Sequence, residues 1–301
     1  MSHGLSGLVV SEVPEWFARS VREARKEQSI EVDGVSIALR WWGRPGAPGV
    51  VLVHGGAAHS RWWDHIAPML GDYRVVAIDL SGHGRSGRRD LYSVRSWTAE
   101  LVAVCGLPEI GPRPVVIAHS MGGWVSLNAG AEAGDLLGGV IVIDSPVRER
   151  SPEEMEASSR RAFGPLRTYP DPETALGHFR TVPEQPNSLP FVVDHIARHS
   201  LVRTEAGWQW RFDPKIFGNA KPRPEMLRRV GTRVALLRAE HGLLTRTISD
   251  DMYELLGRRA PVVEIPEAGH HPMLDQPLSL ITALRALLAD WGHSEACSAS
   301  R

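Results

Sequence analysis

The chain has 301 residues, of which 43% are hydrophobic, and its 34 lysines and arginines nearly balance its 35 aspartates and glutamates. This length suits one large domain with an insertion, or two domains. Because the net charge is close to zero, the sequence gives no sign of a basic surface that would bind nucleic acid or an anionic membrane. Its two cysteines, Cys105 and Cys297, form no disulfide framework or metal-ligand spacing, which fits a reducing compartment. Because we find no signal peptide and no apolar run that could span a bilayer, we expect a soluble, cytoplasmic protein.

The first half of the chain alternates between expected strands and helices. Residues 1–28 are expected to form an N-terminal extension with a short amphipathic helix that begins near Pro14. A hairpin follows, because alternating apolar residues flank Asp33-Gly34. Strands are then expected at 50–53, 73–78, 115–118 and 139–143, and helices at 60–70, at 94–105 and from 124. This alternation predicts a parallel sheet with helices on both faces.

The pattern changes at residues 146–222, where prolines are frequent and charges dense. Helices are expected here at 152–163, 171–179 and 191–200, with a short strand at 208–212. We interpret this stretch as an inserted, mainly helical cap. Some of its aromatic residues would line an apolar pocket, although most would form the cap's own core; they are Phe163, Phe179, Phe191, Trp208 and Trp210.

The last part returns to the earlier pattern. Strands are expected at 233–238 and 262–265 and a final helix at 278–291. The core would therefore comprise residues 29–145 and 223–292. The polar tail, 293–301, is expected to be disordered.

Residues 114–123 carry the clearest chemical signal. An apolar strand ends abruptly at His119-Ser120, and a helical pattern starts directly after Gly122-Gly123. Small residues are needed where the backbone doubles back so tightly. Such a turn brings the Ser120 hydroxyl, the amide of Met121 and a helix N-terminus to one point at the end of a strand.

This stretch resembles the nucleophile elbow, G-x-S-x-G, of the α/β-hydrolase family, with Ala118 at the first glycine position. Three other stretches are similar to that family in the same order: 54–56 (His-Gly-Gly), 79–86 (Asp-x-x-Gly-His-Gly-x-Ser) and 268–277 (Ala-Gly-His through Gln-Pro). The resemblance covers about 29–145 and 224–292. It implies a doubly wound, mostly parallel sheet with an inserted cap, and structural roles for His54 and His83.

The resemblance also implies a Ser-His-acid triad in that chain order. Serine is a weak nucleophile that needs an adjacent base, and the base needs an acid to fix its tautomer. Ser120 is the expected nucleophile. His270, which follows Ala-Gly directly, is the expected base, and His271 is the neighbouring alternative.

Two carboxylates are candidates for the acid of the triad. Many family members carry an aspartate at the position that Gly242 occupies in this chain. Other branches place the acid at the end of the strand after the elbow helix, where this chain has Asp144. We therefore expect Asp144 to be the acid, with Glu240 as the alternative.

The resemblance further implies that the amides of Gly56 and Met121 bind the oxyanion, with Gly55 beside them. No cofactor or metal is expected. The expected function is a serine hydrolase that cleaves an ester, thioester or related acyl bond of a small, largely apolar substrate through an acyl-enzyme. A carbon–carbon bond hydrolase or a cofactor-free perhydrolase could use the same triad, and a non-hydrolytic ligand receptor on this fold is an alternative of another class. The expected partner is a small molecule, with no nucleic acid or membrane.

Overall fold

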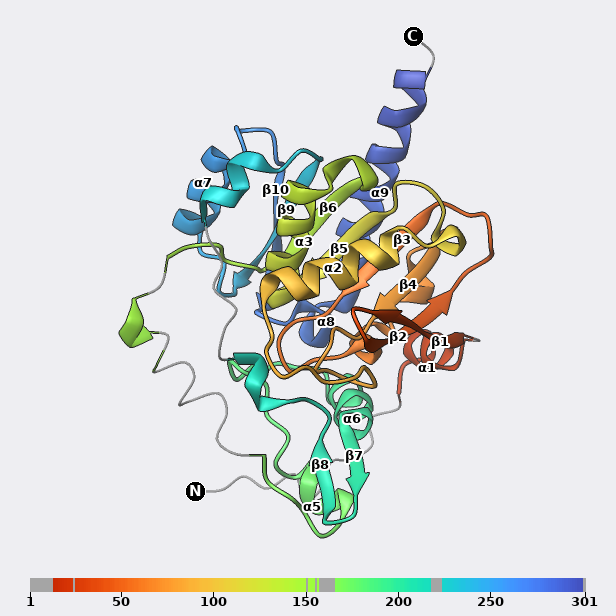
Figure 1. Ribbon diagram of the computed structural model, residues 1–301, viewed down its shortest axis with the longest axis vertical. Helices are drawn as coiled ribbons and strands as arrows, with labels where there is room; N and C mark the ends of the chain where they lie inside the picture. The colour runs from red at the N-terminus through yellow and green to blue at the C-terminus, as the bar shows by residue number, and fades with distance from the viewer. Residues whose placement is uncertain are drawn as a thin grey trace.

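A computed structural model describes residues 13–23, 25–149, 151–154, 156, 166–217 and 224–299, with side chains up to residue 292. An eight-stranded sheet in the order β1-β2-β4-β3-β5-β6-β9-β10 forms the centre of this part of the chain (Figure 1). The strands are β1 (Lys26–Val32), β2 (Val35–Trp42), β3 (Gly49–Val53), β4 (Arg74–Ile78), β5 (Val115–His119), β6 (Gly139–Ile143), β9 (Val234–His241) and β10 (Val262–Gly269). The β1–β2 and β2–β4 pairs are antiparallel and the remaining pairs are parallel, so the predicted, mostly parallel sheet is confirmed.

Helices cover both faces of the sheet. They are α1 (Glu15–Arg22), α2 (Val94–Cys105), α3 (Met121–Glu132), α7 (Arg246–Leu255), α8 (Pro272–Asp275) and α9 (Pro277–Ala299), joined by the short 3₁₀ helices η1 (Ser60–Trp63), η2 (Ala67–Met69), η3 (Pro108–Ile110), η4 (Gly134–Leu136) and η6 (Pro224–Arg229). No helix among the described residues is long and apolar enough to cross a membrane.

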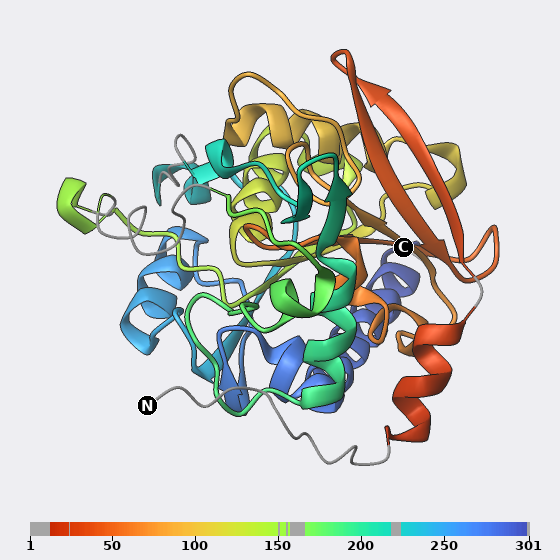
Figure 2. The ribbon, with the colours of Figure 1, turned by 90° about the horizontal axis from the view of Figure 1, so that it is seen from below.

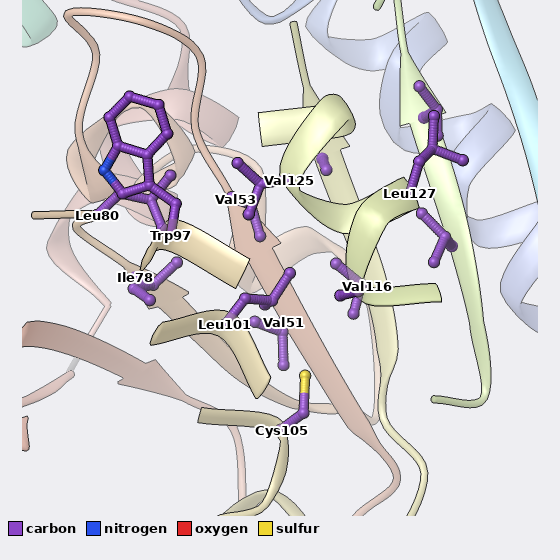
Figure 3. Close-up of a cluster of buried hydrophobic side chains, with 14 of the residues drawn as sticks. Val51, Val53, Ile78, Leu80, Trp97, Leu101, Cys105, Val116, Val125 and Leu127 are labelled. Carbon is purple, nitrogen blue, oxygen red and sulfur yellow. The ribbon is translucent and has the colours of Figure 1, made fainter. Parts of the chain in front are cut away.

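The sheet separates two hydrophobic cores. Because successive side chains of a strand point to opposite faces, Val51 and Val53 of β3 enter one core, while Val50 and Leu52 enter the other. Figure 3 shows the first core, in which Trp97 and other side chains of α2 meet those of β3 and β5. The second core packs against α9, α1 and η1. Burial on both faces explains why these strands are continuous apolar runs.

The segment between β6 and β9 contains α5 (Pro172–Leu176), α6 (Pro190–His199), the antiparallel pair β7 (Leu201–Thr204) and β8 (Gly207–Trp210), and η5 (Pro214–Phe217). Figure 1 shows α5, α6 and this hairpin gathered at one end of the molecule, near α8. Figure 2 views the same end and shows α6 and β7–β8 lying across it, while the β1–β2 hairpin projects at one side. The C-terminal ends of the parallel strands lie at this end of the molecule, because α8 directly follows the C-terminal end of β10.

The prediction of a helix over 60–70 is wrong. The structure has two short 3₁₀ helices there, η1 and η2. Pro68 would clash with the carbonyl group of Asp64 in a continuous α-helix. The Asp64 carboxylate is also fully buried and accepts a hydrogen bond from Arg40 at 2.7 Å, which holds the turn between the two pieces against the sheet.

The predicted elements between β6 and β9 are recovered unevenly. The helix expected at 191–200 is α6. The stretch 208–212, which alternates like a short strand or one arm of a hairpin, contains β8, and its hairpin partner is β7. The helix expected at 171–179 is shorter in the structure, where α5 ends at Leu176 and Gly177 is its C-cap. The helix expected at 152–163 lies mostly outside the described residues.

Both ends of the chain differ from expectation. The extension does not reach residue 28, because β1 already begins at Lys26, which pairs with Trp41 in the hairpin. The tail at 293–301 is not wholly disordered: α9 continues to residue 299, and 300–301 lie outside the described residues. A single glycine, Gly292, costs a helix only about 1 kcal/mol, so it does not end this one.

Because the buried ring of His65 is neutral, we expect it to make the free energy of unfolding fall in acid. His65 is fully buried, its Nε2–H donates to the carbonyl of Met273 at 2.8 Å, and burial lowers its pKa to about 4. The unfolded chain, with a histidine pKa near 6.5, binds this proton first, so the contribution is complete above about pH 6.5 and is lost as pH falls toward 4. Between pH 7 and pH 5, we expect the free energy of unfolding to fall by about 2 kcal/mol less in His65→Gln than in wild type. Urea denaturation at the two pH values measures this difference. The same change at the exposed His178 is the control; equal pH slopes for His65→Gln and wild type would contradict the prediction.

Candidate active site

The turn between β5 and α3 is as tight as its small residues indicated. Ser120 has φ 51° and ψ −120°, a strained conformation for a residue other than glycine. A Cβ on Gly122 would lie 2.5 Å from the carbonyl oxygen of His54, and a Cβ on Gly123 would lie 2.2 Å from Oγ of Ser145. Larger residues at 122 and 123 would therefore push the turn off β3 and β6. The partly exposed serine is left at the C-terminal end of β5.

Three side chains from three strand ends form one hydrogen-bonded chain. Oγ of Ser120 lies 3.0 Å from Nε2 of His270, the residue after β10. Nδ1 of His270 lies 2.7 Å from Oδ2 of Asp144, the residue after β6. His270 is 3% exposed and Asp144 is fully buried. In the tautomer with its proton on Nδ1, His270 donates to the carboxylate and accepts from the serine hydroxyl.

Backbone groups satisfy the buried carboxylate of Asp144. It accepts N–H bonds from Ala239, Leu243 and Leu244 at 3.3, 2.7 and 3.1 Å. These donors, together with His270, stabilise a negative charge that has no access to water. Asp144 itself has a left-handed backbone conformation, φ 42°, which aspartate tolerates better than most residues.

Gly242 lies against the same carboxylate. A Cβ on Gly242 would lie 2.3–2.5 Å from the three carboxyl atoms of Asp144. The space that a side chain at 242 would enter is thus filled by Asp144, which arrives from the neighbouring strand β6. Glu240, the alternative acid, is exposed, and its carboxylate accepts the amide N–H of Glu267 at 2.8 Å. The structure therefore brings Asp144, and not Glu240, to His270.

Backbone amides border the serine from two sides. Met121 is the first residue of α3, so its N–H has no acceptor within the helix. Gly55 packs directly on the turn: a Cβ there would lie 3.2 Å from Cβ of Ser120. A Cβ on the next residue, Gly56, would lie 3.3 Å from the ring of Phe217 and 3.8 Å from Sδ of Met121. Phe217, at the end of η5, reaches the site although nothing in its local sequence indicated this.

Two histidines near the site, His54 and His83, form hydrogen bonds with backbone groups. Nδ1 of His54 lies 2.7 Å from the carbonyl oxygen of Gly55, and its Nε2 accepts the N–H of Leu80 at 3.0 Å, so His54 ties the ends of β3 and β4 together. His83 contacts the carbonyl of Ser81 through Nδ1 at 3.1 Å. Burial lowers the pKa of both rings, which keeps them neutral.

His119 and His271 surround the His270 ring. Nε2–H of His119 donates to the carbonyl oxygen of His270 at 2.8 Å, and burial lowers the pKa of His119 to about 3. Burial also holds the pKa of His271 well below its usual value. One possible ligand nitrogen from each of the three rings lies within 4.8 Å of the others. Since both nitrogens of His270 already bond Ser120 and Asp144, a metal ion bound by this group would have to break one of those bonds.

The aromatic residues proposed for a pocket mostly pack elsewhere. Phe191 lies 4.9 Å from Phe17 of α1, and Phe179 lies 5.6 Å from Trp210, measured between ring centroids. Trp208 joins a small cluster around Tyr169. Phe179 and Phe191 thus pack against the second hydrophobic core, Trp208 and Trp210 pack within the segment between β6 and β9, and Phe163 lies outside the described residues.

Comparisons with known proteins agree with this arrangement. The model of the Alpha/beta hydrolase family matches residues 50–283. The esterase Rv0045c of Mycobacterium tuberculosis is 28% identical over 265 residues, which cover 85% of this chain and 87% of that protein. Lipase LipV of the same organism is 25% identical over 228 residues, covering 75% and 86%. A solved E-2-(acetamidomethylene)succinate hydrolase superposes with a TM-score of 0.78 over 88% of this chain and 100% of its own, at 18% identity, a likeness of fold alone.

Proposed function

Because the chain belongs to the alpha/beta hydrolase family, we propose that it is a serine hydrolase that cleaves esters through an acyl-enzyme, with Ser120 as nucleophile, His270 as base and Asp144 as acid. The observation that carries this proposal is the continuous chain of hydrogen bonds from Ser120 to Asp144, at 3.0 and 2.7 Å. Hydrolysis of esters is supported by the similarity to an esterase and a lipase over most of the chain.

The proposed reaction follows from these contacts. Oγ of Ser120 attacks the ester carbonyl carbon while its proton moves to Nε2 of His270. Asp144 stabilises the resulting imidazolium, and the amides of Met121 and Gly56 donate to the carbonyl oxygen as it becomes negative. The oxyanion collapses, the alcohol leaves with the proton from His270, and the acyl group remains on Ser120. Water, deprotonated by His270, then attacks the acyl-enzyme and releases the carboxylic acid.

The two histidine rings beside His270 are neutral, which favours its role as the base. The pKa values of His119 and His271 are lowered by burial, so neither ring adds a positive charge beside His270 at neutral pH. Of the three rings, His270 is the one paired with a carboxylate, which favours its protonated form in the transition state.

The substrate class is a small, largely apolar acyl compound, with residues 146–222 as a cap over the site. Support comes from Phe217 of η5, whose ring lies beside Gly56, and from Trp62, whose ring centroid lies 5.3 Å from that of His271. Apolar walls with a few directed polar groups are typical of small-molecule sites.

Stopped-flow hydrolysis of p-nitrophenyl esters, from acetate to decanoate, tests this proposal. We expect a burst of p-nitrophenol close to one equivalent per enzyme on the substrates that acylate faster than they deacylate, followed by steady turnover. The chain length with the highest kcat/KM then measures the acyl pocket. Absence of turnover on every ester would overturn the ester specificity. In that case, stabilisation by a ligand that is not consumed would favour a receptor, and cleavage of a vinylogous diketone would favour carbon–carbon hydrolysis.

A further inference from the structure

A glutamine from the segment between β6 and β9 holds the loop that carries His270. The side chain of Gln185 makes two hydrogen bonds to the backbone of one residue: Oε1 accepts the N–H of His271 at 2.8 Å, and Nε2 donates to the carbonyl oxygen of His271 at 3.0 Å. Gln185 is 86 residues from His271 in the chain, so this contact is tertiary. The N–H group bound by Oε1 of Gln185 belongs to the peptide bond between His270 and His271.

The approach is close enough to require a glycine. A Cβ on Gly269 would lie 2.6–2.9 Å from the side-chain atoms of Gln185. Any side chain at 269 would therefore displace the amide of Gln185 from His271. The absence of a side chain at Gly269 therefore leaves the space that the side chain of Gln185 occupies.

Gln185 completes a set of three restraints on the backbone around His270. From the central sheet, His119 donates to the carbonyl oxygen of His270 at 2.8 Å. From the same loop, the carboxylate of Asp275 accepts the N–H of Gly269 at 2.7 Å. Gln185 supplies the third restraint, and it comes from outside the hydrolase core.

The same segment docks on the loop at a second point. The N–H of Leu189 donates to the carbonyl oxygen of Leu274 in α8 at 2.7 Å, just before α6 begins. Residues 185–189, which we call the docking segment, therefore run beside the loop 269–274. A movement of the docking segment away from the core would break the bonds of Gln185 and Leu189 together.

We propose that Gln185 is a positioning residue for His270, and that it makes the alignment of the base depend on the docking of the segment 185–189. This inference rests on the proposed function of His270. The ring must stay aligned with Ser120 on one side and Asp144 on the other, and misplacing a catalytic group by about 1 Å can cost up to about 10²-fold in rate.

Two variants of Gln185 separate this role from simple packing. Gln185→Met keeps the side-chain volume and removes both hydrogen bonds, whereas Gln185→Glu keeps the acceptor for His271 N–H and loses the donor. Gln209→Met is the matched control, because Gln209 lies in β8 and bonds only Thr168 among the contacts seen, at 2.9 Å. Active sites are counted in each sample with a fluorophosphonate, which phosphonylates an activated serine such as Ser120 and releases fluoride. The kinetics of p-nitrophenyl ester hydrolysis are then measured from pH 5 to 9.

We expect kcat per titrated site to fall about tenfold in Gln185→Met and at least as much in Gln185→Glu, where a carboxylate oxygen would face the carbonyl oxygen of His271, with KM changed by less than about twofold. The dependence of kcat/KM on pH should also change in Gln185→Met, because the contacts of His270 with Ser120 and Asp144 change. The neighbouring titratable rings, His119 and His271, stay neutral through burial over most of this range. Gln209→Met should match wild type.

A purely structural Gln185 would give another result: a lower Tm and fewer titrated sites in Gln185→Met, with kcat per site and the pH profile unchanged, and this outcome overturns the proposal. Failure of the underlying function is recognised separately. In that case wild type itself shows no fluorophosphonate labelling and no ester turnover.

Discussion

Replacement of Ser120 by alanine is expected to lower kcat/KM for esters by about 10⁴-fold or more while the fold stays intact. The change removes the hydroxyl that we propose as the nucleophile, at the point where β5, α3 and His270 meet. Its hydroxyl lies 3.0 Å from Nε2 of His270, so the variant keeps the base but gives it no nucleophile to activate. The amides of Met121 and Gly56 remain, and they account for whatever residual rate survives over uncatalysed hydrolysis.

A second serine in the same helix provides the control. Ser126 is fully buried and its Oγ donates to the carbonyl oxygen of Gly122 at 2.8 Å, so Ser126→Ala removes a hydroxyl without touching the reacting atoms. We expect this variant to keep kcat/KM within a few-fold of wild type. Burst amplitude, kcat/KM and Tm are measured on all three proteins. Turnover by Ser120→Ala at the wild-type rate would exclude Ser120 as the nucleophile.

The strands and the turn around Ser120 could be predicted because their information is local. A strand buried on both faces must be apolar throughout, and β6 begins and ends where its apolar run does. The tight turn needs small residues, and the 2.5 and 2.2 Å distances at Gly122 and Gly123 show why. The preference for Asp144 over Glu240 came instead from the resemblance to those branches of the family that place the acid at the end of the strand after the elbow helix.

The contacts around the site that the sequence did not reveal are all tertiary. Gln185 and Phe217 reach the site from distant parts of the chain and have no distinctive local pattern. His119 lies in the turn beside Ser120, but its partner, the carbonyl group of His270, is 151 residues away. The break in 60–70 has a local cause in Pro68 and a tertiary one in Asp64, which turns inward to Arg40, a partner 24 residues away. Aromatic content alone likewise could not separate Phe217, beside the site, from Phe191, which packs against α1.

Asp144→Asn is expected to lower kcat by about 10³- to 10⁴-fold, whereas Glu240→Gln should change kcat by less than about twofold. An amide at 144 cannot stabilise the imidazolium of His270, and it favours the tautomer that no longer accepts the serine proton. The exposed carboxylate of Glu240 contacts Glu267 and not His270. Steady-state kinetics of the two variants, with Tm measured in parallel, provide the comparison. The opposite ranking in kcat would transfer the role of the acid to Glu240.

The position of Gly242 extends this prediction to a rescue. A Cβ at 242 would lie within 2.5 Å of the carboxyl atoms of Asp144, so an acid attached to β9 could occupy the space that β6 now fills. We expect Asp144→Gly to be as impaired as Asp144→Asn, and the added change Gly242→Asp to recover about tenfold or more of the lost kcat, because a carboxylate returns to the neighbourhood of Nδ1 of His270. Gly242→Asp alone should lower both kcat and Tm, since two carboxyl groups would then compete for one buried space and one set of N–H donors. Recovery in the double variant would mean that the site requires a carboxylate at one place in space and accepts it from either strand. If Asp144→Gly keeps wild-type kcat, the buried carboxylate serves only to join β6 to the loop after β9.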